Sequence, residues 1–374
     1  MTASAVLAGT RTRALFTGDD PVDGEIRRTW RELRPADDAE VLASIGAGER
    51  AVVALPFAPG GAGVAHLVGG TGAARPPATG IARTLTHRVT ATPTPQEYTA
   101  RVRAALARIE LGAIDKVVLG RSLEIVSDPP LTPGEIVDGL VAARPGRFVF
   151  SLPLGVPRTA EEETPWLVGA SPELLLRRRG SLVTSTPLAG SVPRSPDPVE
   201  DRRRAEALRD SAKDLAEHAY VVDAIVTTLR RVGTDVVAPA RPEVLSTDTL
   251  HHLATPVRAQ VPGLDALRLA RLLHPTPAVG GTPTTSALLT IDELEGDGRG
   301  LLTGAVGWVD ARGDGELAVT IRAGVLQGAR LRLYAGAGIV AGSDPDAEVA
   351  ETGAKLATMA RAIGLADELE GRAI

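Results

Sequence analysis

Lysine is the rarest charged residue in this sequence. Only three of its 41 basic residues are lysines, namely Lys116, Lys213 and Lys355, and the others are arginines. An arginine does not give up its proton in a protein, whereas a lysine can be tuned towards neutrality and then act as a base. Any one of the three, taken alone, could be a lysine by chance. All three fall in segments that stand out for other reasons, so they are candidates for chemistry.

Two carboxylate pairs accompany the lysines. Asp214 with Glu217, and Glu348 with Glu351, are spaced i, i+3 in segments of helical pattern, so each pair projects from one helix face. Two such faces opposed to each other could hold Mg2+, which prefers oxygen ligands and keeps several waters. Lys355 follows Glu351 by four residues and could receive a carboxylate of a ligand beside the metal. The alternative for each pair alone is a solvated surface.

Glycines form a third signal. They occur in the segments PLAGS (187–191), AVGGTP (278–283) and AGAGIV (335–340). Glycine lets backbone N–H groups approach a ligand oxygen closely. The sequence lacks both the P-loop and the dinucleotide-binding patterns, so a nucleotide site is not predicted. Each segment alone could be an ordinary turn.

The composition excludes several classes of protein. A chain of 374 residues with a formal net charge of -5 and scattered arginines predicts a globular protein and no nucleic-acid surface. It has no cysteine, so disulfides, thiolate metal sites and thiol nucleophiles are excluded. Its first residues carry no leader pattern and no run reaches about 18 apolar residues. We therefore expect a cytoplasmic protein with no membrane segment.

The spacing of apolar residues predicts the elements that position these groups. A helix with a capping box is expected from Thr94, followed by a strand at KVVLGRSLEIV. A long helix is expected over 198–231, and a closing helix from Pro345. The segment 308–322 has two strand-like runs around a glycine turn, which is typical of an antiparallel hairpin. The predicted fold class is therefore α+β.

A series of short segments carries a family pattern. In chain order they are KVVLGRSLEI, GASPELLL, STPLAGS, SAKDLAEHAYVVDAI, HHLATPV, HPTPAVGGTP, LLTGAVGWVD, TIRAG, AGAGIV and AETGAKL. Over about residues 90 to 365 the sequence resembles the chorismate-utilising enzymes. That family contains isochorismate synthases, salicylate synthases, anthranilate synthase large subunits and aminodeoxychorismate synthases. The resemblance implies one large α+β domain like that of anthranilate synthase component I, with extensive antiparallel sheets packed together and helices outside. Residues 1–90 would be its strand-rich N-terminal part, and 91–374 its chorismate-binding catalytic region.

The resemblance also implies roles for individual residues. Lys116 would be the base that activates water, and Glu173 would be the general acid that protonates the departing 4-hydroxyl of chorismate. Mg2+ would be held by Glu217 and Glu351, with Asp214 and Glu348 as their helical companions. The substrate would be bound by Arg322, Lys355, Gly336, Gly338, Gly190, Ser191, His252 and Ala278.

The expected activity is that of a magnesium-dependent isochorismate synthase. Water would arrive at C2 of chorismate while the 4-hydroxyl leaves, which requires one base and one acid on opposite faces of the ring. Family members that use ammonia usually lack the lysine base and draw ammonia from a glutaminase. This chain has Lys116, has alanine at position 189 where aminodeoxychorismate synthases tend to carry lysine, and has no cysteine to run a glutaminase. We therefore expect a monomer without a glutaminase subunit.

Two alternatives remain open. Salicylate synthases share Lys116 and Glu173 and go on to eliminate pyruvate, but they tend to have threonine at the positions of Ala278 and Ser191. A non-catalytic relative that only binds chorismate would have lost residues that this chain keeps.

Relatives commonly place an aromatic residue at the position of Leu302, so an aliphatic cavity wall is expected here. Lys213 is interpreted as an exposed helix charge. The product could serve catechol siderophore, menaquinone or salicylate synthesis, and the PELL and PLAGS segments favour the first.

Overall fold

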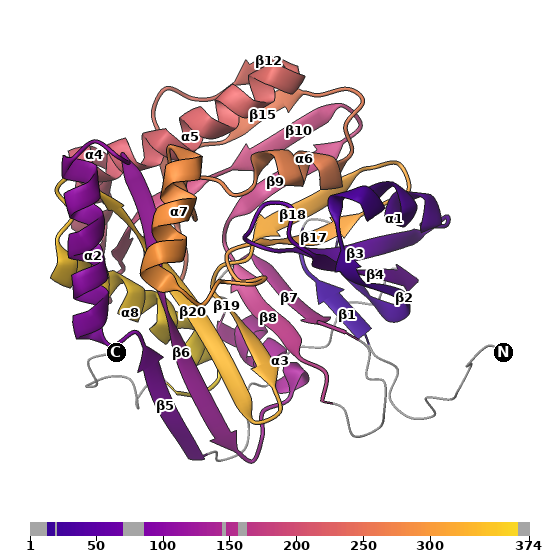
Figure 1. Cartoon of the computed structure of the whole chain (residues 1–374), viewed down its shortest axis with the longest axis horizontal. Coiled ribbons are helices and arrows are strands. Elements are labelled where there is room, and N and C mark those ends of the chain that lie inside the picture. The colour runs from indigo at the N-terminus through magenta and orange to yellow at the C-terminus, as the bar shows by residue number, and fades with distance from the viewer. Residues whose placement is uncertain (1–12, 19–20, 70–85, 144–146, 156–162, 366–374) are drawn as a thin grey trace.

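The computed structural model describes residues 13–365 apart from 19–20, 70–85, 144–146 and 156–162 (Figure 1). The helices are the 3-10 helix η1 (Pro35–Asp37), α1 (Asp38–Ser44), α2 (Pro95–Glu110), α3 (Pro133–Ala143), α4 (Pro198–Asp210), α5 (Ala212–Val232), α6 (Ala266–Leu273), α7 (Thr284–Glu295) and α8 (Pro345–Ala362). The strands are β1 (Arg13–Phe16), β2 (Val22–Leu33), β3 (Glu49–Leu55), β4 (Gly63–Gly69), β5 (Thr86–Thr92), β6 (Lys116–Asp128), β7 (Phe148–Pro153), β8 (Trp166–Ser171), β9 (Leu174–Arg179), β10 (Leu182–Thr186), β11 (Leu188–Pro193), β12 (Thr234–Val237), β13 (Glu243–Ser246), β14 (Leu250–Ala254), β15 (Val257–Gln260), β16 (Gly281–Thr282), β17 (Ala305–Val309), β18 (Gly315–Val319), β19 (Ala323–Gln327) and β20 (Arg330–Val340).

The described strands pair antiparallel throughout. Most of them join one extended sheet, and β11, β14 and β13 form a separate three-stranded sheet. The hairpin expected over 308–322 is formed by β17 and β18, with Ala305 opposite Val319. The N-terminal strand β3 pairs with β17, so distant parts of the chain share one sheet. The predicted α+β fold with extensive antiparallel sheets is confirmed.

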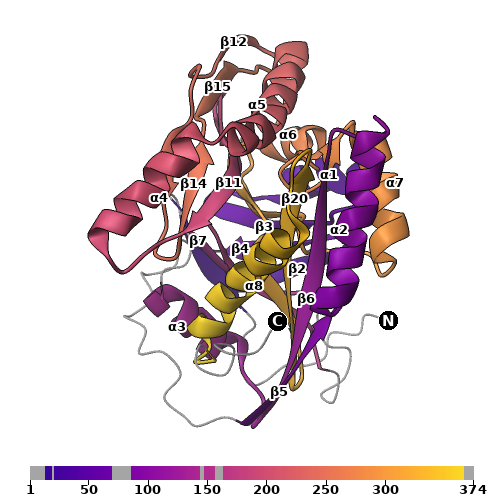
Figure 2. The same ribbon diagram turned by 90° about the vertical axis from the view of Figure 1, so that its left-hand side faces the viewer.

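The two long strands β6 and β20 form the ribbon on which the glycine segment AGAGIV lies. Their register places Gly338 opposite Val118 and Val340 opposite Lys116. Helices α2 and α8 pack against this ribbon and against each other (Figure 2). Helix α7 contacts β6 as well (Figure 1). The ribbon therefore meets the helix that carries Glu351.

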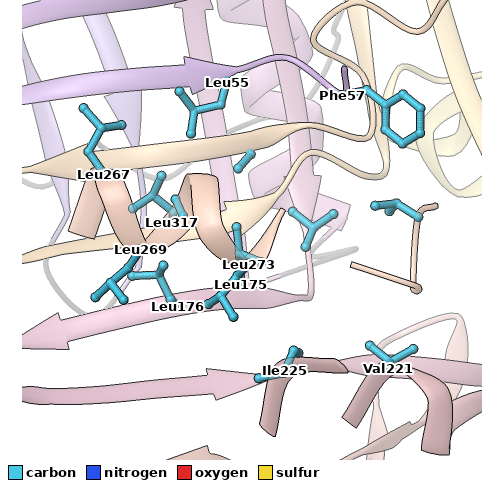
Figure 3. Packing of buried hydrophobic residues seen from close by; sticks show 14 of the residues in the cluster. Leu55, Phe57, Leu175, Leu176, Val221, Ile225, Leu267, Leu269, Leu273 and Leu317 are labelled. Atoms are coloured by element: carbon cyan, nitrogen blue, oxygen red, sulfur yellow. The ribbon is translucent and has the colours of Figure 1, made fainter. Parts of the chain in front are cut away.

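Helix α5 directs Glu217 inward through the spacing of its buried side chains. Val221, Ile225 and Leu229 are buried, lie four residues apart and join the largest apolar cluster, together with leucines of α6, β9 and β18 (Figure 3). Glu217 precedes Val221 by four residues and therefore continues the same helix face. The burial that fixes α5 on the sheet thus fixes the direction of Glu217.

Two expected helix boundaries can be compared with the structure. Helix α2 begins after Thr94 with the predicted capping box, because Thr94 N donates to Glu97 at 2.8 Å and Glu97 N donates to the Thr94 hydroxyl at 3.3 Å. The single long helix expected over 198–231 is wrong, since α4 and α5 are separated at Ser211. Ser211 has extended backbone and caps α5 by accepting a hydrogen bond from Asp214 N. None of the helices in the described ranges is long and apolar enough to cross a membrane.

Candidate active site

A cavity brings together residues from widely separated segments of the chain. Its wall is formed by parts of β6, β11, β14, β20, α5, α8 and the loops before β9, β16, β17 and β19. The predicted site residues that line it are Glu173, Gly190, Ser191, Glu217, His252, Ala278, Arg322, Gly336, Gly338, Glu351 and Lys355. The cavity therefore unites most of the residues that the sequence singled out.

Lys116 lies directly behind this cavity. It is the first residue of β6, its side chain is fully buried, and its Nζ lies 3.1 Å from Oε1 of Glu217. A Cβ atom at Gly338 would lie 2.0 Å from Oε1 of Glu217 and 3.1 Å from Cε of Lys116. Glycine at position 338 therefore leaves the space that the side chains of Glu217 and Lys116 occupy.

Glu173 lies in the short connection between β8 and β9. Pro172 and Glu173 separate β8 from β9, because proline cannot donate to a strand ladder. The Glu173 side chain is buried, with the backbone N–H of Leu188 donating to it at 3.4 Å. Burial raises the pKa of Glu173 to about 7, and the opposing charges of Lys116 and Lys355 only partly offset that. A carboxyl group with this pKa can deliver a proton near neutral pH.

His252 and Arg322 form a buried pair on the cavity wall. Nη2 of Arg322 lies 2.7 Å from Nε2 of His252. Burial and then the charge of Arg322 hold the pKa of His252 well below its usual value, so the imidazole is neutral and Nε2 accepts the hydrogen bond. Burial also lowers the pKa of Arg322, to about 10, which leaves the guanidinium charged. His252 thus orients a cation that faces the cavity.

Ser191, Glu351 and Lys355 are connected to each other across the cavity. The Ser191 hydroxyl donates to Oε1 of Glu351 at 3.2 Å, and Nζ of Lys355 lies 2.7 Å from the same atom. Nζ of Lys355 also donates to the carbonyl oxygen of Gly336 at 2.9 Å. Lys355 therefore ties α8 to β20 at the glycine segment.

All three lysines pair with glutamates of the predicted metal site. Lys116 pairs with Glu217 and Lys355 with Glu351, and Nζ of Lys213 lies 2.8 Å from Oε1 of Glu348. The interpretation of Lys213 as an exposed helix charge is therefore wrong. Its side chain is 34% exposed and bridges α5 to the buried Glu348 on α8, whose pKa is raised by burial and by the charge of Glu351.

The companion carboxylates lie outside the cavity. Asp214 lies against Gly190 and borders a neighbouring groove that shares Ser191 and Glu351 with the cavity. Glu348 is 1% exposed and turns towards Lys213. Both are therefore next to the pair Glu217 and Glu351 without reaching the space that these two line.

The carboxylates at the cavity are candidate ligands for a magnesium ion. Within the described residues, no group of three or more acidic or histidine side chains is arranged to hold a metal. Magnesium keeps several waters, however, and is commonly held by one or two carboxylates together with its ligand. Glu217 and Glu351 line one cavity from two different helices and supply hard oxygen donors. The residues therefore fit a magnesium ion bound through two carboxylates.

The sequence interpretation missed several residues of the cavity. Tyr334, Val118, Val279 and Thr303 line it, whereas Leu302 belongs to an adjacent apolar cluster and does not line it. The expectation that Leu302 forms part of the cavity wall is thus wrong, and the ring of Tyr334 joins the aliphatic side chains that line the cavity. Tyr334 precedes Gly336 and Gly338 in strand alternation, and this spacing could have placed it on the same face.

Comparisons with known proteins agree with this geometry. A family model described as chorismate binding enzyme matches residues 73–364. The chain is 46% identical over 284 residues to isochorismate synthase DhbC of Bacillus subtilis (strain 168), covering 75% of this chain and 71% of the relative. It is 43% identical over 265 residues to isochorismate synthase EntC of Escherichia coli (strain K12), covering 71% and 66%. The crystal structure of DhbC from Bacillus anthracis superposes with a TM-score of 0.84 at 36% identity, covering 94% of this chain and 96% of that one.

Proposed function

The chain belongs to the family of chorismate binding enzymes and acts as an isochorismate synthase. We propose the following roles for its residues in that reaction. Chorismate gains a hydroxyl at C2 from water and loses its 4-hydroxyl. The neutral amine form of Lys116, and not the ammonium that pairs with Glu217, takes a proton from the attacking water. Glu173 gives a proton to the departing hydroxyl. The observation that carries this assignment is Glu173, a buried carboxyl group on the cavity with a pKa of about 7 and within electrostatic reach of Lys116.

The dianionic substrate requires cations and backbone donors at fixed positions. Arg322, oriented by His252, and Lys355 supply the charges, and the N–H groups of Gly336 and Gly338 supply close backbone contacts. Gly190, Ser191 and Ala278 line the remainder of the binding cavity. The assignment is supported by the buried Arg322–His252 contact, since a neutral histidine accepts a hydrogen bond from the guanidinium without cancelling its positive charge.

Magnesium would be held by Glu217 and Glu351, with Asp214 and Glu348 beside them. When bound, it would neutralise and orient a substrate carboxylate. The protein residues hold both carboxylates in position, because Nζ of Lys116 lies 3.1 Å from Glu217 and Nζ of Lys355 lies 2.7 Å from Glu351. Lys213 holds Glu348 and thereby links α5 to α8.

Removing either proposed ligand should weaken magnesium binding. We expect Glu217→Gln and Glu351→Gln each to raise the Kd for Mg2+, measured by calorimetry on the chorismate-free protein, by at least about tenfold, or about 1.4 kcal/mol. Glu293→Gln is the matched control, because Glu293 lies on the exposed surface of α7 and pairs with Arg108. An unchanged Kd in both ligand variants would show that these carboxylates do not bind the metal.

The product distinguishes this activity from that of salicylate synthase. Ala278 and Ser191, where salicylate synthases tend to have threonine, support a reaction that stops at isochorismate. We expect chorismate and Mg2+ to give isochorismate without pyruvate, as measured by chromatography and a coupled pyruvate assay. Pyruvate and salicylate formed at the rate of chorismate loss would assign the salicylate reaction. Binding of chorismate without turnover would indicate a non-catalytic relative.

We further propose that the enzyme works as a cytoplasmic monomer without a glutaminase subunit. The base Lys116 makes water a sufficient nucleophile, so the reaction needs no ammonia.

A further inference from the structure

A buried ion pair lies directly behind one wall of the cavity. Nε and Nη2 of Arg299 donate to the two carboxylate oxygens of Glu295 at 2.8 and 2.6 Å, and the side chains are 1% and 8% exposed. Neither residue lines the cavity, so neither reaches the substrate. A buried ion pair contributes little net stability, because the cost of desolvation offsets the attraction. The role of this pair therefore follows from the backbone and side-chain groups to which it is hydrogen-bonded.

Arg299 connects the strand of the base to the loop of Ala278. Its Nη2 donates to the carbonyl oxygen of Val118 at 2.7 Å, and its Nη1 donates to that of Val279 at 2.7 Å. Val118 and Val279 both line the cavity. Val118 is two residues after Lys116 on β6, so the two side chains lie on the same face of the strand. The guanidinium therefore adds to the backbone hydrogen bonds that join β6 to this loop, such as that from Val118 N to the carbonyl oxygen of Gly280 at 2.7 Å.

Glu295 connects Arg299 to a second strand of the cavity wall, β20. Its Oε1 accepts a hydrogen bond from Gly120 N on β6 at 2.9 Å, and it accepts another from the hydroxyl of Tyr334 on β20 at 3.1 Å. A Cβ atom at Gly120 would lie 1.9 Å from that hydroxyl, so glycine is required for the contact. The rings of Phe57 and Tyr334 flank the guanidinium, with centroids 4.4 and 5.3 Å from its central carbon.

We propose that Arg299 is a positioning residue for water addition. Together with the backbone hydrogen bonds between these segments, it holds β6 at the distance from the 276–280 loop that the base requires. The planar guanidinium satisfies two carbonyl oxygens and two carboxylate oxygens at once, which a lysine ammonium cannot do. Groups that orient a reacting side chain without touching the substrate commonly contribute 10- to 100-fold, and small displacements of a base are costly. This inference rests on the proposed function of Lys116.

The test is Arg299→Lys in the otherwise unchanged full chain, with isochorismate formation followed under saturating Mg2+. We expect kcat to fall about 10- to 100-fold while KM stays within about twofold, because the carboxylate receptors Arg322 and Lys355 are not part of the connection. Glu295→Gln is the second variant, with a smaller loss of the same kind. It decides the question if Arg299→Lys does not fold.

The matched control is Arg271→Lys, which alters another arginine–carboxylate pair, in which Asp38 is buried and Arg271 is 16% exposed. Arg271 on α6 donates to both oxygens of Asp38 at 2.8 and 2.9 Å, away from the cavity. We expect the control to lower Tm with kcat unchanged. A variant of Arg299 or Glu295 that lowers Tm but keeps the parent kcat would overturn the proposal. A parent protein that forms no isochorismate would instead overturn the proposed function, so the two failures are distinct.

Discussion

Lys116→Ala is expected to lower kcat for isochorismate formation by about 10²- to 10⁴-fold, the usual contribution of a general base. Lys116 is buried, adjoins the cavity through Glu217, and is the only lysine on the strands that line it. Loss of its amine leaves the water without a proton acceptor, while Arg322 and Lys355 still bind the substrate carboxylates. We therefore expect KM for chorismate to change far less than kcat in steady-state assays.

Lys116→Arg separates the role of the proton acceptor from that of the charge. Arginine keeps the positive charge beside Glu217 but does not release a proton in a protein. If Lys116 is the base, the arginine variant is as inactive as the alanine variant, and both still bind Mg2+ by calorimetry. Activity in Lys116→Arg close to that of the parent protein would show that position 116 requires only a cation.

Local spacing predicted those parts of the fold that local interactions determine. The capping box at Thr94 and the hairpin over 308–322 depend on residues near each other in sequence, and the structure contains both. The break at Ser211 was missed because the apolar stripe continues on both sides of it, and only the capping geometry of Ser211 marks the new helix. Capping by a serine within a periodic run has no signal in the hydrophobic pattern.

Residue types in the sequence indicated most of the side chains that line the cavity. They did not indicate the ion pairs and hydrogen bonds between these side chains. The rarity of lysine drew attention to Lys355, which lines the cavity, and to Lys116, which lies behind it. Lys213 was interpreted as an exposed helix charge, although it pairs with the buried Glu348. The partner of each lysine depends on how closely α5, α8 and β6 approach, and tertiary packing alone sets that approach. The role of Arg299 could not be predicted for the same reason. Nothing in the sequence distinguishes this residue from the many other arginines.

Glu173→Gln is expected to lower kcat by about 10²- to 10⁴-fold, because glutamine cannot deliver a proton to the departing hydroxyl. The pH profile provides the sharper measurement. Glu173 must be protonated to act as an acid, and its pKa is raised by burial to about 7. The kcat/KM of the parent enzyme should therefore fall as the pH rises through about 7, and the residual activity of the glutamine variant should not show this fall. A parent profile that is flat from pH 6 to about 8 would contradict the assignment.

Protein stability provides an independent check of the same pKa. The folded state holds the Glu173 proton more tightly than the unfolded chain does, since the pKa rises from 4.5 to about 7 on burial. The protonated carboxyl group therefore favours folding fully below about pH 4.5, and this contribution is lost as the pH rises through 7. Glutamine carries no such proton, so the unfolding free energy of Glu173→Gln should change less between pH 5 and about 8 than that of the parent protein. Equal pH dependence in urea titrations of the two proteins would mean that Glu173 is ionised in the folded cavity and cannot be the acid.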